Sequence, residues 1–477
     1  MKPSTPVKAA DTPHVGDDAH GVSEVRSSYS AQWRAPTASI EPAHKSSNVG
    51  IIPCDWQIRS LREVAQVQSG IAKNAKRQVH NAVDVHYLRV ANVQDGYLDL
   101  DQMSTIRLSR DELVRYAVLP GDVLMNEGGD LDQLGRGAMW RGEFDPCVHQ
   151  NHVFVVRCRS GLLPEFLNAW TASTPARRYF LLAGKQTTNL ASINKKALGE
   201  LPVPIPQPEE QRAIAEALAD VDGLLGALDA LIAKKRAIKQ AAMQQLLTGK
   251  TRLPDRTGAW QTKCLGELVT FLSGGTPSRG VSAYWHGEIP WISATSLRTF
   301  YVWRSGNNLS KAGVAAGSRM APVGSTLLLV RGSALHNEIL AGLVTKPVCF
   351  NQDVKALVPN SSLVPEFLTF CLHGRADELL RLVSSAGNTA GVLDTKILKA
   401  FEILLPDKRE QEAISAALAD IDADIAAIEA RREKTRAIKQ GMMQQLLTGR
   451  VRLIQAKCSK GSESSAQTGQ RAKGCAP

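Results

Sequence analysis

Residues that could carry catalytic chemistry are present, but their spacing completes no catalytic motif. His149 and His152 lie three positions apart, yet no further ligand joins them at metal-binding spacing, which favours a structural or hydrogen-bonding role. Gly249-Lys250-Thr251 resembles the end of a phosphate-binding loop, but Gln244 stands where the first glycine of that loop belongs. The tetrapeptides that hold the target base in amino-methyltransferases are absent from the sequence. We therefore expect no catalytic site, no metal and no cofactor in this chain.

The net charge indicates an acidic partner. Lys and Arg (57) outnumber Asp and Glu (46), which gives a formal charge of +11 and a pI near 9.3 over 477 residues. A basic excess of this size favours binding to nucleic acid or to an anionic membrane surface. The other interpretation is a soluble basic protein that binds neither.

Cysteine usage and hydropathy favour a cytoplasmic protein. The eight cysteines are scattered without a Cys-x-x-Cys pair, so neither a zinc site nor a disulfide framework is indicated. The sequence has no apolar run near the length of a membrane span and no signal-peptide core after Met1. We expect a chain that is neither secreted nor inserted in a membrane.

An internal repeat organises the sequence. Residues 206–253 return at 406–453 with a constant offset of 200, without a gap, and with more than half of the positions identical. The strings RAIKQ and MQQLLTG occur in both copies. Self-similarity at a fixed offset over this length is the signature of a duplication.

Each copy of the repeat predicts one long helix, at 206–250 and at 406–450. Pro206 or Pro208 suits the start of the first helix, because proline lacks only an N–H that would have no partner there. Gly249 and Gly449 stand where a left-handed C-cap would end each helix. About 40 residues at about 1.5 Å of rise give a rod about 60 Å long.

The apolar residues of the two helices follow alternating steps of four and three. This is the a/d pattern of a coiled coil, although ordinary bundle helices are the alternative. Because a compact domain between the helices returns the chain near its exit point, we expect the two helices to pack antiparallel. The predicted packing residues are Ile214, Leu218, Val221, Leu225, Leu228, Ile414, Leu418, Ile421, Ile425 and Ile428, with Ile232 continuing the first stripe.

Two weakly similar segments, 51–205 and 256–405, precede the two helices. Both open on Trp-Gln, both contain Pro-Glu-Phe-Leu, and both alternate short β-rich runs with Gly- and Pro-rich turns. The predicted fold class is α+β, with two mixed α/β domains separated by two long duplicated helices. Residues 1–50 and 451–477 are polar and low in large apolar residues, so we expect disordered ends there.

The order of domains and helices, together with their motifs, resembles the specificity (S) subunits of type I restriction–modification systems. The proline-rich approach ending in Glu-Gln at 206–211 recurs at 406–411, and each helix ends in MQQLLTG followed by a basic residue and Arg-Leu. Further matches are Ser-Gly-Gly-Thr-Pro at 273–277, Thr-Thr-Asn at 187–189 and Ile193-Asn194. The resemblance covers about 51–454.

The resemblance implies a non-catalytic DNA-binding subunit. Each α/β domain would be a target-recognition domain for one half of a split, asymmetric DNA sequence, and the central (206–250) and distal (406–450) helices would fix the gap. Two modification (M) subunits would dock on the helices, bind S-adenosylmethionine and methylate adenine. Restriction (R) subunits would add ATP- and Mg-dependent translocation and cleavage.

Candidate DNA contacts are Lys, Arg, Asn, Gln, Ser and Thr residues in loops, because these side chains can reach phosphates or base edges. In the first domain they are Lys73, Lys76, Arg77, Asn92, Gln94, Arg136, Lys185, Gln186 and Thr188. In the second domain they are Thr276, Ser278, Arg279, Ser293, Thr295, Arg298, Arg331 and Asn351. Each of these could instead be a solvated surface side chain. Trp140, Trp285 and Trp291 are expected to anchor cores rather than to wedge between bases.

Two interpretations stay open beside this one. The chain could be a coiled-coil scaffold that joins two protein-binding domains without touching DNA, or a self-contained methyltransferase or nuclease, which the missing motifs disfavour. A steep loss of DNA affinity with salt would separate DNA binding from the scaffold. The basic residues late in the helices form either a solvated face or a docking surface, and they are Lys234, Lys235, Arg236, Lys239, Arg436 and Lys439.

Overall fold

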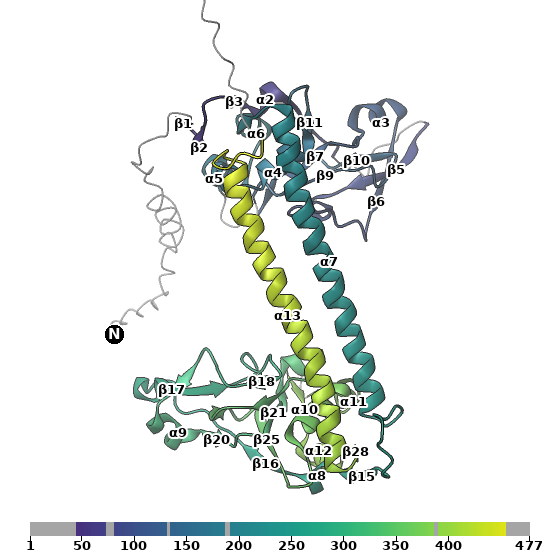
Figure 1. Ribbon diagram of the computed structural model, residues 1–477, viewed down its shortest axis with the longest axis vertical. Coiled ribbons are helices and arrows are strands. Elements are labelled where there is room, and N and C mark those ends of the chain that lie inside the picture. The colour runs from purple at the N-terminus through teal and green to yellow at the C-terminus, as the bar shows by residue number, and fades with distance from the viewer. Residues whose placement is uncertain (1–43, 73–80, 131–133, 187–190, 386–389, 455–477) are drawn as a thin grey trace, which may run out of the picture. The chain divides into compact units, whose positions relative to one another are not determined.

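The computed structural model describes residues 44–72, 81–130, 134–186, 191–385 and 390–454 (Figure 1). The chain divides into two compact units, unit 1 (1–222 and 437–477) and unit 2 (223–436). Each unit holds one of the predicted α/β domains together with part of each long helix. The prediction of mixed α/β domains is confirmed.

Unit 1 is built around a four-stranded antiparallel sheet with the order β4-β11-β7-β9 and a three-stranded sheet with the order β10-β5-β6. Its strands are β1 (His44–Ser47), β2 (Gly50–Pro53), β3 (Gln57–Ser60), β4 (Ala65–Ser69), β5 (Val83–Leu88), β6 (Ser104–Leu108), β7 (Val123–Asn126), β8 (Gly128–Gly129), β9 (Gly137–Met139), β10 (Cys147–His149), β11 (Val153–Cys158), β12 (Lys185–Gln186), β13 (Ala191–Ser192) and β14 (Pro202–Ile205). Its short helices are α2 (Leu61–Val64), α3 (Arg110–Tyr116), α4 (Pro164–Thr171), α5 (Thr174–Ala183) and α6 (Lys195–Gly199).

Unit 2 repeats this plan. The sheet β16-β25-β21-β23 corresponds to β4-β11-β7-β9 and gains β18 at one edge, and a second sheet has the order β19-β17-β24-β20. Its strands are β15 (Gln261–Cys264), β16 (Val269–Ser273), β17 (Trp285–Ile292), β18 (Tyr301–Val302), β19 (Asn308–Leu309), β20 (Arg319–Ala321), β21 (Thr326–Leu329), β22 (Arg331–Gly332), β23 (Ala341–Val344), β24 (Val348–Phe350), β25 (Val354–Pro359), β26 (Ser384–Ser385), β27 (Gly391–Val392) and β28 (Glu402–Leu405). Its short helices are α8 (Leu265–Leu268), α9 (Lys311–Gly317), α10 (Pro365–Gly374), α11 (Ala376–Arg381) and α12 (Thr395–Ala400).

The central strands of each domain are covered on both faces. All four residues of β7 and of β21 are buried, which explains why these segments are continuous apolar runs rather than alternating ones. The Pro-Glu-Phe-Leu string begins α4 in unit 1 and α10 in unit 2, where proline occupies the first turn. Its phenylalanine and leucine are buried in both units, so the shared string marks an equivalent core position.

The two long helices, α7 (Pro208–Leu246) and α13 (Lys408–Leu446), keep the repeat offset of 200 at both ends (Figure 1). They are shorter than the predicted spans because the chain turns before the glycines. Gly249 and Gly449 have φ values of 69° and 67°, in the left-handed region that a helix-ending glycine permits. None of the helices in the described part of the chain is long and apolar enough to cross a membrane.

The predicted packing stripe divides between two environments. Ile214 and Leu218 lie in the core of unit 1 with Met443, Leu446 and Leu447 from the end of α13. Ile414 and Leu418 lie in the equivalent core of unit 2 with Met243 and Leu247. These four stripe residues therefore pack against a globular domain as well as against the other helix, because each long helix begins at the surface of the domain that precedes it. Leu228, Ile232 and Ile425 are also buried, whereas Val221, Leu225, Ile421 and Ile428 are half-buried.

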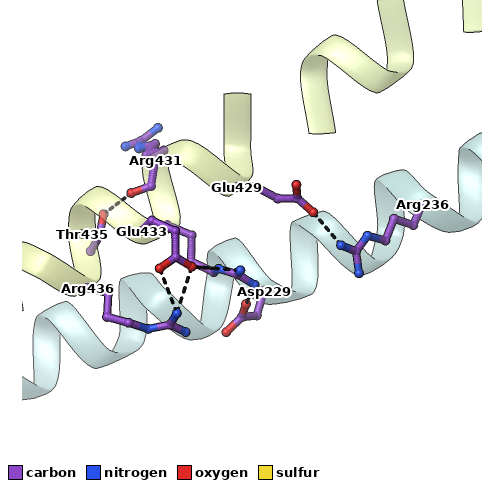
Figure 2. Close-up of polar contacts among 8 residues, drawn as sticks. Asp229, Arg236, Glu429, Arg431, Glu433, Thr435 and Arg436 are labelled. Carbon is purple, nitrogen blue, oxygen red and sulfur yellow. Dashed lines mark hydrogen bonds and ion pairs between the residues drawn. The ribbon is translucent and has the colours of Figure 1, made fainter. Parts of the chain in front are cut away.

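Ion pairs join the two long helices (Figure 2). In unit 2, Asp229 pairs with Arg432 (3.0 Å) and Arg236 with Glu429 (2.5 Å), and Lys235 and Lys239 pair with Asp424 and Asp422 at 2.7 and 2.6 Å. In unit 1, Lys439 pairs with Asp222 at 2.5 Å. From Asp229 through Lys235 to Lys239 along α7, the partners on α13 run backwards, from Arg432 through Asp424 to Asp422. Much of the predicted basic turn is thus engaged with the opposite helix.

A buried glutamate fixes the start of each long helix. Glu410 accepts hydrogen bonds from Arg252 (2.6 and 2.7 Å) and from the Trp260 indole (3.0 Å). Glu210 accepts from Arg452 and from the Trp56 indole, the latter at 3.0 Å. In each unit this Glu–Arg–Trp clasp joins the beginning of one long helix, the segment that follows the other, and the Trp-Gln opening of the domain.

The glutamine after each glutamate holds the neighbouring domain loop. The Gln211 side chain accepts from the Leu163 N–H and donates to the carbonyls of Gly161 and Pro206. Gln411 makes the same three bonds, to Val364, Ser362 and Pro406. The Glu-Gln motif is therefore a structural joint, buried in both units.

The predicted disordered ends are too long at their inner limits. Residues 44–53 form the β1–β2 hairpin, and Val49 and Ile52 pack into the core of unit 1. Arg452 is held by Asp55 at 2.9 Å and by Glu210. Two apolar residues and one arginine are too weak a pattern to stand out in the sequence. Residues 1–43 and 455–477 lie outside the described residues.

Replacing Arg452 with methionine is expected to destabilise unit 1. Glu210 would keep only the uncharged Trp56 indole N–H as a donor, and removing one partner of a buried ion pair costs about 3 kcal/mol. Urea denaturation of the full chain measures the loss. Arg450→Met, at an exposed position two residues earlier, serves as the control and should change stability by less than about 0.5 kcal/mol. Equal effects of the two substitutions would contradict the clasp.

Candidate nucleic-acid interface

In unit 2, three loops converge on the turn between β24 and β25 (residues 350–353). The Gly275 N–H bonds to the Phe350 carbonyl at 2.9 Å, and the Asn351 N–H bonds to the Ile292 carbonyl at 3.0 Å. The Arg331 N–H bonds to the Asp353 carbonyl at 3.3 Å. The β24–β25 turn thus brings together loops that follow β16, β17 and β21.

These loops carry most of the predicted contacts of the second domain. Thr276 donates to Gln352 at 2.5 Å, Asn351 donates to Asp353 at 3.1 Å, and the Ser293 and Thr295 hydroxyls lie 3.0 Å apart. Arg331 is exposed at the start of β22. The structure therefore gathers Thr276, Ser293, Thr295, Arg331 and Asn351 around one turn, although Asn351 is only 7% exposed.

Two further arginines of this domain have distinct surroundings. Arg298 is ion-paired with Glu338, so its charge is partly neutralised. Arg279 is exposed and lies over the rings of Trp285 and Trp291, close to Ser278, whose carbonyl accepts from the Trp285 indole. Trp291 and Trp140 are buried, as expected of core anchors, whereas Trp285 is half-buried.

The equivalent turn of unit 1, between β10 and β11 (149–152), has the same backbone bonds. The Ile71 N–H bonds to the His149 carbonyl at 2.9 Å, and the Gln150 N–H bonds to the Leu88 carbonyl at 2.8 Å. Glu127 donates its N–H to the His152 carbonyl at 2.9 Å, as Val330 does to Asp353 in unit 2 at 2.8 Å. The two turns thus make equivalent backbone hydrogen bonds, and the residues of one turn are related to those of the other by an offset of 201.

The side chains on the unit 1 turn differ from those in unit 2. His152 bonds to Glu127 at 2.6 Å, and Gln150 accepts from the Val90 N–H at 3.4 Å. Arg136 donates to the predicted contact Gln94 at 3.4 Å. The turn of the first domain therefore carries Gln150, Asn151 and His152 where the turn of the second carries Asn351, Gln352 and Asp353.

Asn92 is a correction to the predicted contacts. Its side chain is 3% exposed, accepts from the Arg89 N–H at 2.9 Å and donates to the Asp99 carbonyl at 2.8 Å. Ser296 caps the matching turn of unit 2 through the Ser293 N–H at 3.0 Å. Asn92 therefore supports the loop after β5 rather than offering an amide to DNA, because its side-chain oxygen and nitrogen are hydrogen-bonded to the backbone.

Several predicted contacts of the first domain stay predictions. Lys185 is exposed in β12, and Gln186 pairs with Ala191 through its backbone. The remaining four lie outside the described residues, and they are Lys73, Lys76, Arg77 and Thr188.

Most of the polar residues on the turns themselves were not among the predicted DNA contacts. Gln150, Asn151 and His152 in unit 1 correspond to Asn351, Gln352 and Asp353 in unit 2, and only Asn351 was among the candidates. The signal was the offset of 201 already visible in Pro-Glu-Phe-Leu, which also aligns these two turns.

His149 illustrates how the turn is held. It is fully buried, its Nδ1 lies 2.6 Å from the Val153 carbonyl oxygen, and its equivalent in unit 2 is Phe350. Burial lowers the pKa of His149 to about 4. A neutral, packed histidine agrees with the structural role expected from the sequence. Among the residues that the structure describes, no group of three His, Cys, Asp or Glu side chains could hold a metal ion.

The chemistry of the two turns suits hydrogen bonding to base edges. Amides and hydroxyls both donate and accept, carboxylates accept, and arginine donates through two N–H groups at once. The backbone of each turn is fixed, so these groups are presented in a defined order. Such a surface can distinguish donors from acceptors on a ligand, which is what sequence readout requires.

A family model described as the type I restriction modification DNA specificity domain matches the chain twice, at residues 53–235 and 258–437. The putative type I restriction enzyme MjaX specificity subunit of Methanocaldococcus jannaschii is 22% identical over 428 residues, 87% of this chain and 97% of that protein. The EcoR124I/EcoR124II specificity subunit of Escherichia coli is 28% identical over 234 residues, 48% of this chain and 57% of that protein.

The fold has a counterpart among solved structures. A chain from work on complex assembly and conformational transition of the type I R-M system matches with a TM-score of 0.54 and 18% identity. The match covers 84% of this chain and 99% of that one. At this identity the likeness supports the fold.

His149→Phe is expected to reduce the pH dependence of stability, to which His373, whose pKa burial also lowers, contributes independently. Because the folded-state pKa lies near 4 and the unfolded value near 6.5, stability is complete above pH 6.5 and is lost as pH falls toward 4, by roughly 3 kcal/mol. Urea denaturation at pH 7 and pH 5 measures the slope of each protein. An unchanged slope in His149→Phe would show that another group causes the acid sensitivity.

Proposed function

Because the chain belongs to the type I restriction modification DNA specificity family, we propose that it is the specificity subunit of a type I restriction–modification complex that reads a split, asymmetric DNA sequence. The family assignment supports sequence-specific DNA recognition. The finer proposal is that each α/β domain reads one half-site. The observation that carries it is the pair of turns with the same backbone hydrogen bonds and different side chains.

Matched turns with different side chains favour an asymmetric target. Gln150, Asn151 and His152 in one unit stand where Asn351, Gln352 and Asp353 stand in the other. Hydrogen-bond donors and acceptors on base edges differ between base pairs, so different side chains on one backbone select different bases. Phosphate contacts, supplied by exposed lysines and arginines, would position both domains without selecting a sequence.

We further propose that α7 and α13 form an antiparallel coiled coil that sets the gap between the half-sites. The support is the order of the ion pairs, in which Asp229, Lys235 and Lys239 meet Arg432, Asp424 and Asp422. The buried stripe of Leu228, Ile232 and Ile425 lies in the same region. Opposite charges that face each other along a seam select one register and orientation.

The outward faces of the long helices are the proposed docking sites of two modification subunits. Leu224, Leu231 and Ile238 recur every seven residues on α7 and are 40–46% exposed. Catalysis is assigned to the partners, with S-adenosylmethionine on the modification subunits and ATP with Mg on the restriction subunits. This chain would supply the DNA address and the assembly platform.

A base-resolution map of methyladenine tests the proposal. DNA from cells with this chain and its modification subunit should carry a split methylated motif that is absent when this chain is deleted. The motif would report both half-sites and the gap. If an expressed and active modification subunit produced no motif that depended on the chain, the scaffold interpretation would replace DNA recognition.

Adding one heptad to each long helix tests the spacing role. Insertions after Ala230 and Ala430, which the ion pairs place nearly opposite each other, lengthen the pair by about 10 Å, or about three base pairs of DNA. Whole heptads preserve the packing stripe. The same methylation map should show unchanged half-sites and a gap longer by about three base pairs. A motif with altered half-sites and the original gap would argue against a fixed ruler.

A further inference from the structure

Arg279 is held on an aromatic shelf in unit 2. Its guanidinium carbon lies 5.0 Å from the centroid of the Trp285 ring and 5.7 Å from that of Trp291. The two indoles pack edge to face with centroids 5.3 Å apart. No ion pair links Arg279 to a carboxylate of the described residues. The guanidinium is therefore exposed, charged and oriented without an internal salt-bridge partner.

The loop that carries Arg279 is fixed at two points just before the arginine. The indole N–H of Trp291 donates to the Gly275 carbonyl and that of Trp285 to the Ser278 carbonyl, both at 3.1 Å. Gly274 is packed so closely that a Cβ atom would overlap with the Phe350 and Asn351 carbonyls. The shelf thus also fastens the backbone of the loop to the β24–β25 turn.

The loop of Arg279 and the β24–β25 turn that it contacts both carry hydrogen-bonding groups. Thr276 is bonded to Gln352 on the turn at 2.5 Å. The side-chain carbonyl oxygen of Asn351 is buried and has no hydrogen-bond partner among the described residues. A buried polar atom without a partner is uncommon, and it marks a place where a ligand or water completes the bonding.

We propose that Arg279 reads a guanine in the half-site of the second domain. This inference rests on the proposed function and names one base-reading residue within it. An arginine of fixed orientation donates two parallel hydrogen bonds, and only guanine offers two acceptors, O6 and N7, at that spacing in the major groove. A phosphate contact needs only a positive charge, which a flexible arginine or lysine supplies equally well. The aromatic shelf reduces the loss of side-chain freedom on binding, which favours the oriented contact.

Arg304 provides a matched control. It belongs to the same domain, is exposed, and lies over the ring of Trp303 at 5.1 Å, so its own environment also includes a cation–π contact. None of the three loops on the β24–β25 turn carries it. Arg279→Lys and Arg304→Lys both keep the positive charge and replace the rigid, planar guanidinium fork with a flexible ammonium group.

The experiment maps methyladenine in cells that express each full-length variant with the modification subunit. With Arg279→Lys, one G·C position in one half-site should lose about tenfold or more of its preference over other bases. The rest of that half-site, the other half-site and the gap should stay as in the parent chain. Arg304→Lys should give the parent motif.

Three outcomes would overturn the inference while leaving the proposed function intact. Arg279→Lys could keep every base preference, could relax an A·T position, or could lower methylation at all sites without relaxing any position, as a phosphate contact would. A parent chain that produced no split motif would instead refute the proposed function, and the inference with it. Full-length protein levels of the variants, measured in the same cells, separate lost recognition from lost folding.

Discussion

The structure depends on two equivalent buried carboxylates, one in each unit. Glu210 and Glu410 are 2% and 0% exposed, and each is acceptable inside the protein only because an arginine and an indole N–H saturate it. A buried charge without partners costs far more than most single interactions contribute. The arginine in each clasp comes from the segment after the other long helix. The carboxylate therefore requires the start of one helix and the end of the other to meet at each domain.

This requirement explains why the duplicated sequence is confined to the helices and their flanks. Glu-Gln at the start of one helix and Arg-Leu after the end of the other are parts of the same joint. Replacing the glutamate or the arginine alone would therefore leave its partner's charge without a counter-ion. The loops around the two turns face no such constraint. Their backbone bonds are made by N–H and C=O groups that every residue except proline possesses. Side chains there can differ between units while the turn keeps its shape.

The sequence alone therefore predicts the joint and the recognition loops to different degrees. The duplication, both helices and their glycine ends follow from the offset of 200 and from local propensity, which are properties of neighbouring residues. The pairing of Arg452 with Glu210, 242 residues apart, is set by tertiary packing and leaves no local pattern. Asn92 was misassigned because asparagine suits base contact and loop capping equally, and only burial separates the two roles. Arg279 was a candidate by type, but the sequence does not show that the loop folds back so that its guanidinium lies over Trp285 and Trp291 of the following strand, β17.

In both units, the contacts that hold the backbone of the turn are made by side chains other than the exposed polar ones. The groups that present the turns, such as the indoles under Arg279 and the imidazole of His149, are anchored by backbone carbonyls rather than by the exposed polar residues. Substituting an exposed residue of the turn removes contacts to a ligand without removing a core contact. Stability then resides in the clasps and the sheets, whereas the proposed selectivity would reside in side chains that the fold does not need. Under the proposed half-site readout, this separation would let each domain change the bases that it reads without changing the backbone that presents its side chains.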